Sequence, residues 1–240
     1  RILPERKEEA DTSMHLEFLH AGESGRETGI GQSAIALDGI QKELLRMMSM
    51  AEQNVKDSFD AVQDGTTRLL RTVTEREEYI DFLNKEISKY ISGVLAKETN
   101  PQTSRQISVL FKVCGNLERI GDHAMNICEY TRLMEEKGIS FSQAAREEIR
   151  SMQKISLEAM ENMKAIGESA GKDIGEIERM EQKIDDMTEQ YRANQMNRLH
   201  GGQCSDEACV LYSEMLTDFE RIGDHILNIG QEMGMGKVSA

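Results

Sequence analysis

The feature that most constrains this chain is a phrase that occurs twice. LERIGDHAMNI occupies residues 117–127 and FERIGDHILNI occupies residues 219–229. Each copy places a glycine, and two acids four residues apart, in a stretch that otherwise has helical periodicity. In a helix, glycine costs about 1 kcal/mol relative to alanine, and acids four apart repel each other. Two copies of the phrase indicate an internal duplication. Because both copies keep residues that cost helix stability, we expect these residues to have a function.

Around the phrase, apolar residues recur at spacings of three, four and seven, which is typical of amphipathic helices. Only 2 Pro and 5% aromatic residues accompany 15 Met, a composition that favours helices. Turn-forming residues divide the chain into six helical stretches, at 64–67, 97–103, 138, 169–173 and 200–206. The sequence therefore predicts an all-α fold of six long helices, arranged as a tandem of two three-helix bundles.

The predicted domain organisation follows these breaks. An irregular lead-in covers residues 1–32, the first bundle covers 33–138 and the second covers 139–240. Short loops predict an antiparallel, up-down-up path within each bundle.

Pairs of the form Glu-x-x-x-Asp occur on the second and third helix of each bundle. Residues four apart share one helix face, so two antiparallel helices direct four carboxylates to one place. An oxygen-rich cluster suits Mg, Mn, Ca or ferric iron, although acidic pairs on an acidic helical protein are commonly a solvated face. The candidate ligands are Glu77, Asp81, Glu118, Asp122, Glu181, Asp185, Glu220 and Asp224, with Asn126 and Asn228 as possible additional donors.

The register of the phrase predicts where this site lies. The acids fall beside the apolar seam, so we expect a site on the flank of each bundle, open to water. Gly121 and Gly223 fall closer to the packed side, where they would let a neighbouring helix or a large side chain come close. His123 and His225 point about 100° away from the acids that precede them. We therefore expect these histidines to be neighbours of the site or surface residues, and not ligands.

Charge and hydropathy exclude several classes of function. A net charge of −14 argues against nucleic acid and against an anionic membrane surface as partners. The chain has no run of 18 apolar residues and no apolar core of a signal peptide near its start. The spacing of Cys114, Cys128, Cys204 and Cys209 does not match a zinc finger, which favours reduced thiols.

At the repeated phrase, the chain resembles the PhoU family from Ser33 to about Met233. That family combines a tandem of three-helix bundles with Glu/Asp-x-x-x-Asp motifs inside a phrase close to LERIGDHAxNI. The first copy is a near-complete match, whereas the second has Ile226 in place of the alanine. The resemblance implies multinuclear metal clusters on the bundle surface, iron in particular, and Mn, Mg, Zn or Ca are kept as alternatives to iron. Their ligands would be the eight acids named above. It also implies control of phosphate uptake.

The family occurs in two settings. One is the cytoplasmic domain of a sodium/phosphate cotransporter, and the other is a free-standing regulator linking a phosphate ABC transporter to a sensor kinase. The long lead-in and its opening RILPERKEEA resemble the exit from a membrane span, and SAIALDGIQKELLRM resembles the first helix of the cotransporter type. We therefore expect the appended domain, at the inner face of the cell membrane. Its partners would be the transporter's membrane domain or a sensor kinase, phosphate bound through metal, and a second copy of the chain.

Two other classes of function remain as alternatives. A di-iron oxidase of the helical-bundle type needs Glu-x-x-His, but His123 follows Glu118 by five residues. The sequence shows no nucleophile with a base and no phosphate-binding loop, so we do not expect an enzyme. A purely structural helical scaffold is the second alternative, and it would retain no stoichiometric metal.

Overall fold

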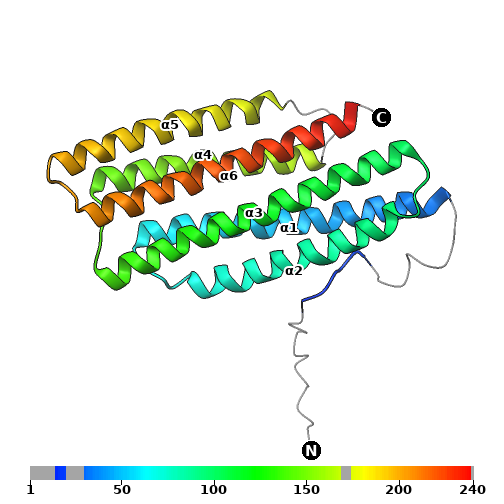
Figure 1. The fold of residues 1–240 in the computed structure, drawn as a ribbon, viewed down its shortest axis with the longest axis horizontal. Helices are drawn as coiled ribbons and strands as arrows, with labels where there is room; N and C mark the ends of the chain where they lie inside the picture. Colours follow the sequence, from blue (N-terminus) through cyan, green and yellow to red (C-terminus); the bar gives the residue numbers. More distant parts are fainter. Residues whose placement is uncertain (1–13, 20–29, 169–173, 239–240) are drawn as a thin grey trace, which may run out of the picture.

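The computed structural model describes residues 14–19, 30–168 and 174–238, and within these ranges it contains helices and no strand (Figure 1). The predicted six-helix, all-α fold is confirmed. The helices are α1 (Ile30–Asp64), α2 (Leu70–Leu95), α3 (Pro101–Lys137), α4 (Gln143–Glu168), α5 (Gly175–His200) and α6 (Asp206–Val238).

The helix ends follow the chemistry of the predicted breaks. Asn100 caps α3, because its side chain accepts hydrogen bonds from the backbone N–H groups of Gln102 and Thr103. Gly138 ends the same helix with φ of 64°, a left-handed conformation that only glycine adopts without strain. The predicted break at 169–173 lies outside the described residues. α1 begins at Ile30, inside the range that the sequence assigns to the lead-in.

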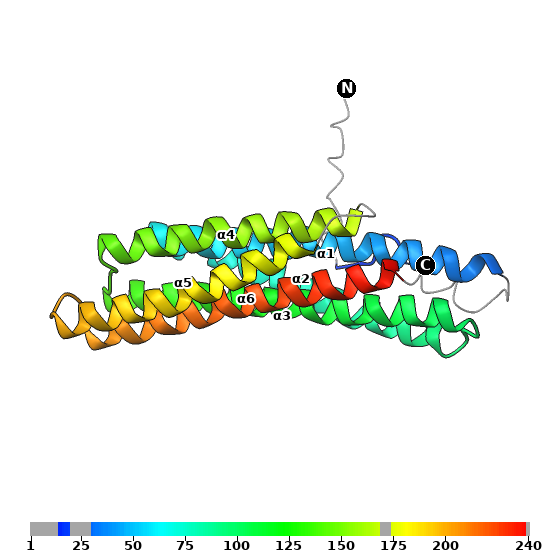
Figure 2. The same ribbon diagram turned by 90° about the horizontal axis from the view of Figure 1, so that it is seen from above.

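The six helices run side by side, and four of them form the middle of the molecule (Figures 1 and 2). Here α1 contacts α4 and α3 contacts α6. In the first bundle α2 packs against α1 and α3, and in the second bundle α5 packs against α4 and α6. One continuous hydrophobic core runs through both bundles. Phe59 of α1 and Phe219 of α6 stack in it, with ring centroids 4.4 Å apart. Because the core is shared, the domain boundary at 138/139 remains a prediction.

Residues 14–19 of the lead-in are irregular but are bound to the first bundle. The fully buried carboxylate of Glu43 accepts hydrogen bonds from the backbone N–H groups of Glu17 and Phe18. Leu19 is buried beside Gly39, where an added Cβ would lie only 2.8 Å from the leucine side chain. The lead-in is therefore anchored on α1. None of the helices in the described ranges is long and apolar enough to cross a membrane.

Candidate metal centre

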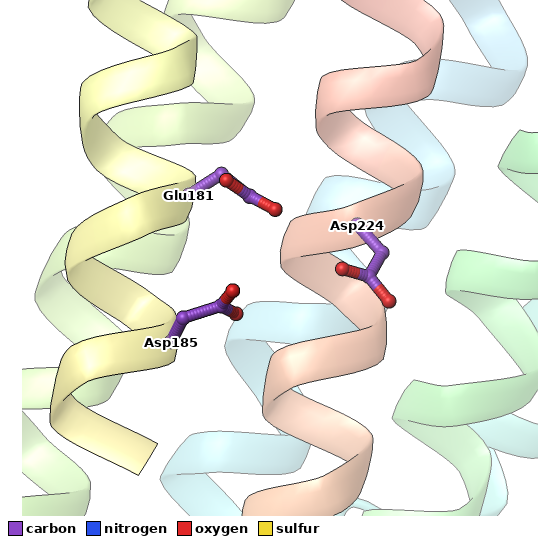
Figure 3. A group of neighbouring side chains, drawn as sticks. All are labelled: Glu181, Asp185 and Asp224. Atoms are coloured by element: carbon purple, nitrogen blue, oxygen red, sulfur yellow. The ribbon is translucent and has the colours of Figure 1, made fainter. Parts of the chain in front are cut away.

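Three carboxylates meet between α5 and α6. Glu181 and Asp185 extend from α5 toward Asp224 of α6 (Figure 3), and one oxygen from each lies within 4.8 Å of the others. No other group of three potential metal-ligating side chains meets this distance in the part of the chain that the structure describes. All three side chains are half-buried at the flank of the bundle. We refer to Glu181, Asp185 and Asp224 as the carboxylate triad.

The triad contains an oxygen that the protein itself leaves unsatisfied. Asp185 Oδ1 is buried and has no hydrogen-bond partner among the described residues. A buried acceptor without a partner is destabilising, especially on a charged group. The cost is removed if a cation binds here, and an all-oxygen donor set suits hard cations. The residues present thus fit the metal that the resemblance implies.

The pKa values of the triad acids reflect the same crowding. Burial raises the pKa of Glu181, and the negative charges of Asp185 and Asp224 raise it further. Burial also raises the pKa of Asp185, followed by the charges of Asp224 and Asp186. Both shifts express the cost of keeping like charges together away from water. A bound cation would offset that cost directly.

Glu220, the fourth predicted acid of the second bundle, lies outside the triad. Its carboxylate accepts a hydrogen bond from Arg192 at 3.3 Å. Arg192 lies on α5 about two turns after Asp185 and therefore on a similar face. The seven-residue spacing is a signal in the sequence that could have pointed to this arginine as a neighbour of the acids. Arg221 also contacts the triad, with 3.2 Å between its Nη1 and Asp224 Oδ2.

The four acids of the first bundle are neighbours but do not form a triad. Burial raises the pKa of Glu77, followed by the charges of Asp122, Asp81 and Glu118, which places all four acids within electrostatic reach of one another. Asp81 is instead paired with Lys85, whose Nζ lies 2.6 Å from its carboxylate. The first bundle therefore presents an acidic surface on which the ammonium group of Lys85 already pairs with one of the four carboxylates.

Glycines bring the helices together at the level of the acids. A Cβ built on Gly223 would lie 3.2 Å from Ile184 Cδ1, and one on Gly121 would lie 3.4 Å from Ile80 Cδ1. The predicted close approach at both glycines is confirmed. Ile184 immediately precedes Asp185 on α5, so the contact that glycine permits also sets the distance between α5 and Asp224.

Gly223→Leu is expected to destabilise the fold and open the triad. The added side chain would overpack against Ile184, which typically costs about 1–3 kcal/mol. Urea unfolding followed by circular dichroism measures the effect. The matched control is Gly93→Leu on the exposed face of α2, where an added Cβ would meet nothing within 4 Å. A loss of stability no larger at Gly223 than at Gly93 would contradict the role of the close contact.

The histidines of the phrase lie between the bundles and not in the triad. His123 Nδ1 lies 2.6 Å from Asp218 Oδ1, and His225 Nδ1 lies 2.8 Å from Asn116 Oδ1. Their rings stack at a centroid distance of 5.5 Å. Burial, followed by the charges of His123 and Arg119, lowers the pKa of His225 to about 4. The histidines therefore belong to the contact between α3 and α6.

The two asparagines of the phrase also lie at this contact. Asn126 Nδ2 donates a hydrogen bond to Asp218 Oδ1 at 3.2 Å. Asn228 lines a groove between α3 and α6. The structure thus directs neither amide into the carboxylate triad, and their role as additional metal donors remains a prediction without support from the geometry.

With metal removed, the free energy of unfolding is expected to fall as the pH rises above about 4.5, the ordinary pKa of Glu. The folded-state pKa values of Glu77, Glu118, Glu181 and Asp185 are raised, so the folded chain binds more protons than the unfolded chain in this window. Stability is then greatest below the unfolded pKa and is lost toward the folded pKa.

Urea midpoints across this pH range, measured in chelator, test the expectation. Glu148 opposes the trend, because hydrogen bonds from Arg198, Tyr212 and Asn194 outweigh its burial and lower its pKa. The control is Glu181→Gln with Asp185→Asn, which should flatten the pH dependence. An unchanged slope in that variant would contradict the assignment to these acids.

Comparison with known proteins identifies the duplication. The sequence matches the PhoU domain twice, over residues 44–131 and 146–233. It is 27% identical over 197 residues to the phosphate-specific transport system accessory protein PhoU homolog 1 of Thermotoga maritima, covering 81% of this chain and 84% of that protein. A Synechocystis homolog of the same description is 23% identical over 201 residues, covering 82% and 88%.

Solved structures show the same fold. PhoU from Pseudomonas aeruginosa superposes with a TM-score of 0.78 at 21% identity, covering 83% of this chain and 96% of that one. The phosphate transport system regulatory protein PhoU from Streptococcus pneumoniae superposes with a TM-score of 0.73 at 16% identity, covering 87% and 98%. Since the domain matches take up most of both bundles, the chain belongs to the PhoU family.

Proposed function

We propose that this chain is a metal-binding regulator of phosphate transport. The proposal draws on the names of its relatives, which describe a phosphate-specific transport system accessory protein and a phosphate transport system regulatory protein. Those names describe regulation and not catalysis, in keeping with the non-enzymatic role expected from the sequence. The partner would be a phosphate transporter or a sensor kinase associated with it.

The comparisons favour the free-standing kind of regulator over the cotransporter domain. The chain spans 84% of the Thermotoga relative and 98% of the Streptococcus structure, and both are described as components of a phosphate transport system. The cotransporter interpretation rested on the lead-in, most of which lies outside the described residues, and on the likeness of residues 33–47 to the first helix of the cotransporter type. Attachment to a membrane domain, and a position at the inner face of the membrane, remain predictions. Membrane fractionation of the product of the complete native reading frame tests both.

The observation that carries the metal-binding part is the buried, partnerless Asp185 Oδ1 within reach of Glu181 and Asp224. Glu181, Asp185 and Asp224 would hold the ion, and iron is the first candidate from the family resemblance. The ion would supply positive charge at a half-buried acidic flank, to which phosphate or an acidic partner surface could bind. In the first bundle, Lys85 would have to leave Asp81 before a cation could bind there.

Uptake of radiolabelled phosphate tests the regulatory role. Cells that lack their own PhoU protein would be compared with and without this chain, at high and at low external phosphate. We expect the chain to change uptake and Asp185→Asn to weaken that change. Identical uptake with and without the chain would contradict the proposal. A scaffold without regulatory function would leave uptake unchanged and would also retain no stoichiometric metal after chelator-free purification.

A further inference from the structure

A groove of about 330 Å³, lined by both polar and apolar groups, lies between α3 and α6, away from the carboxylate triad. Lys112 and Arg119 of α3 face Asn228 and Glu232 of α6 across it. Two cations and one carboxylate thus line a groove in a chain whose net charge is −14. The local balance is opposite to that of the whole molecule, so this groove is more favourable to an anion than the average surface.

Several hydrogen-bond donors in the groove face solvent and have no partner among the described residues. The side chains of Arg119, Asn228 and Gln231 form no hydrogen bond or ion pair with other described residues. Lys112 is bound to Glu232 at 2.9 Å, which leaves two of its three ammonium hydrogens available. A guanidinium, an ammonium and two carboxamides are therefore able to donate to one ligand.

The duplication provides an internal comparison for these groups. Arg119 corresponds to Arg221 in the second copy of the phrase, and Asn228 corresponds to Asn126 in the first. Arg221 is paired with Asp224 at 3.2 Å, and Asn126 donates to Asp218 at 3.2 Å. The same residue types are thus bound to protein groups on the opposite side of the α3–α6 contact, whereas in the groove they face solvent.

Two residues that shape and charge the groove also differ between the two copies. Gly115, where an added Cβ would meet nothing within 4 Å, corresponds to Thr217 in the second bundle. Lys112 corresponds to Glu214. Glycine therefore leaves space, and lysine supplies positive charge, where the other copy has a side chain and a negative charge.

We propose that this groove binds a phosphoryl group, either as inorganic phosphate or as a phosphate monoester. The planar fork of Arg119 matches two phosphate oxygens, and charge-assisted hydrogen bonds of this kind are the strong ones. Lys112, Asn228 and Gln231 complete the donor set. Phe111, which is 45% exposed at the groove, offers an apolar surface to the organic part of an ester. Gly115 allows the ligand to approach the backbone of α3.

Isothermal titration calorimetry in excess chelator tests the proposal with inorganic phosphate and with glycerol 3-phosphate. The chelator removes metal from the carboxylate triad, so this experiment is independent of the metal-binding proposal. We expect one site per chain, with affinity that weakens as ionic strength rises. Tighter binding of glycerol 3-phosphate would identify an ester as the ligand, and equal or tighter binding of inorganic phosphate would identify the free ion.

Three variants locate the site. Arg119→Gln should weaken binding by about tenfold to a hundredfold, the range for a hydrogen bond to a charged group. Gly115→Thr should also weaken binding, because it introduces the residue of the second bundle into the groove without changing any charge. Arg71→Gln, at an exposed position of α2, removes the same charge elsewhere and should leave the affinity unchanged. All three positions are solvent-accessible on helices, so circular dichroism should show a parent-like fold. No binding of either probe, or a parent-like affinity in Arg119→Gln, would overturn the proposal.

Discussion

The double substitution Glu181→Gln with Asp185→Asn is expected to abolish metal binding by the second bundle. Both changes keep the size of the side chain and its hydrogen-bonding capacity, and both remove a negative charge. Only Asp224 of the triad remains charged, and the number of charged ligands sets the affinity for a hard cation. Elemental analysis after purification without chelator or a metal-affinity tag measures the metal content per chain. Equal content in variant and parent would reject the ligand role.

The matched control is the corresponding change in the first bundle, Glu118→Gln with Asp122→Asn. If both bundles bind metal, this variant should lose the metal of the first and keep that of the second, so about half remains. Because no triad is formed in the first bundle, a smaller loss would indicate that the second bundle is the principal site. If each of the two double variants loses all of its metal, the two bundles do not bind metal independently.

Stability measurements separate ligands from a solvated acidic face. With metal present, each double variant should be less stable than the parent, because a ligand that binds only the folded state stabilises it by mass action. In chelator, the order should reverse, because repulsion between the carboxylates has been relieved. A solvated face would instead give shifts within about 0.5 kcal/mol under both conditions.

Phe219→Ala is expected to cause the largest loss of stability among the substitutions considered. The ring is fully buried and stacks on Phe59 across the contact between the bundles. Truncating a buried phenylalanine typically costs about 3–5 kcal/mol. Urea unfolding of the metal-free protein measures it.

Phe111→Ala provides the control, since this phenylalanine is 45% exposed on α3. Its truncation should change the free energy of unfolding by less than about 0.5 kcal/mol. If the two bundles of Phe219→Ala unfold in separate transitions, the packing of this ring is what makes them unfold together in the parent. A cost below 1 kcal/mol at Phe219 would contradict the packing described for this ring.

The helices were predictable because their signals are local. The φ of Gly65, Gly138 and Gly202 is positive, and each glycine lies at a break expected from the sequence. Asn100 and Pro101 start α3 where the pattern indicates. The close contacts at Gly121 and Gly223 were also predictable, since glycines on the packed face of a helix admit a large neighbour.

The arrangement of the acids was only partly predictable, because it depends on contacts between helices. Periodicity places Glu220 beside Asp224, but Arg192 of the neighbouring helix binds it. Spacing alone could have identified Lys85, four residues after Asp81 on the same helix. The pairing of Asn126 with Asp218 joins two bundles, and nothing in either segment specifies it. The continuous core also depends on contacts between the bundles, because apolar residues of each bundle face the other, and the sequence of one bundle alone does not specify it.

The reciprocal contacts between α3 and α6 have the symmetry of an isologous dimer. His123 contacts Asp218 while His225 contacts the corresponding Asn116, as two identical subunits would do across a two-fold axis. In a true homodimer, every substitution appears on both sides of the axis. Joining both copies in one chain removes that restriction, so Asp218 could diverge from Asn116. One polypeptide is thereby able to specialise its two equivalent faces for different ligands.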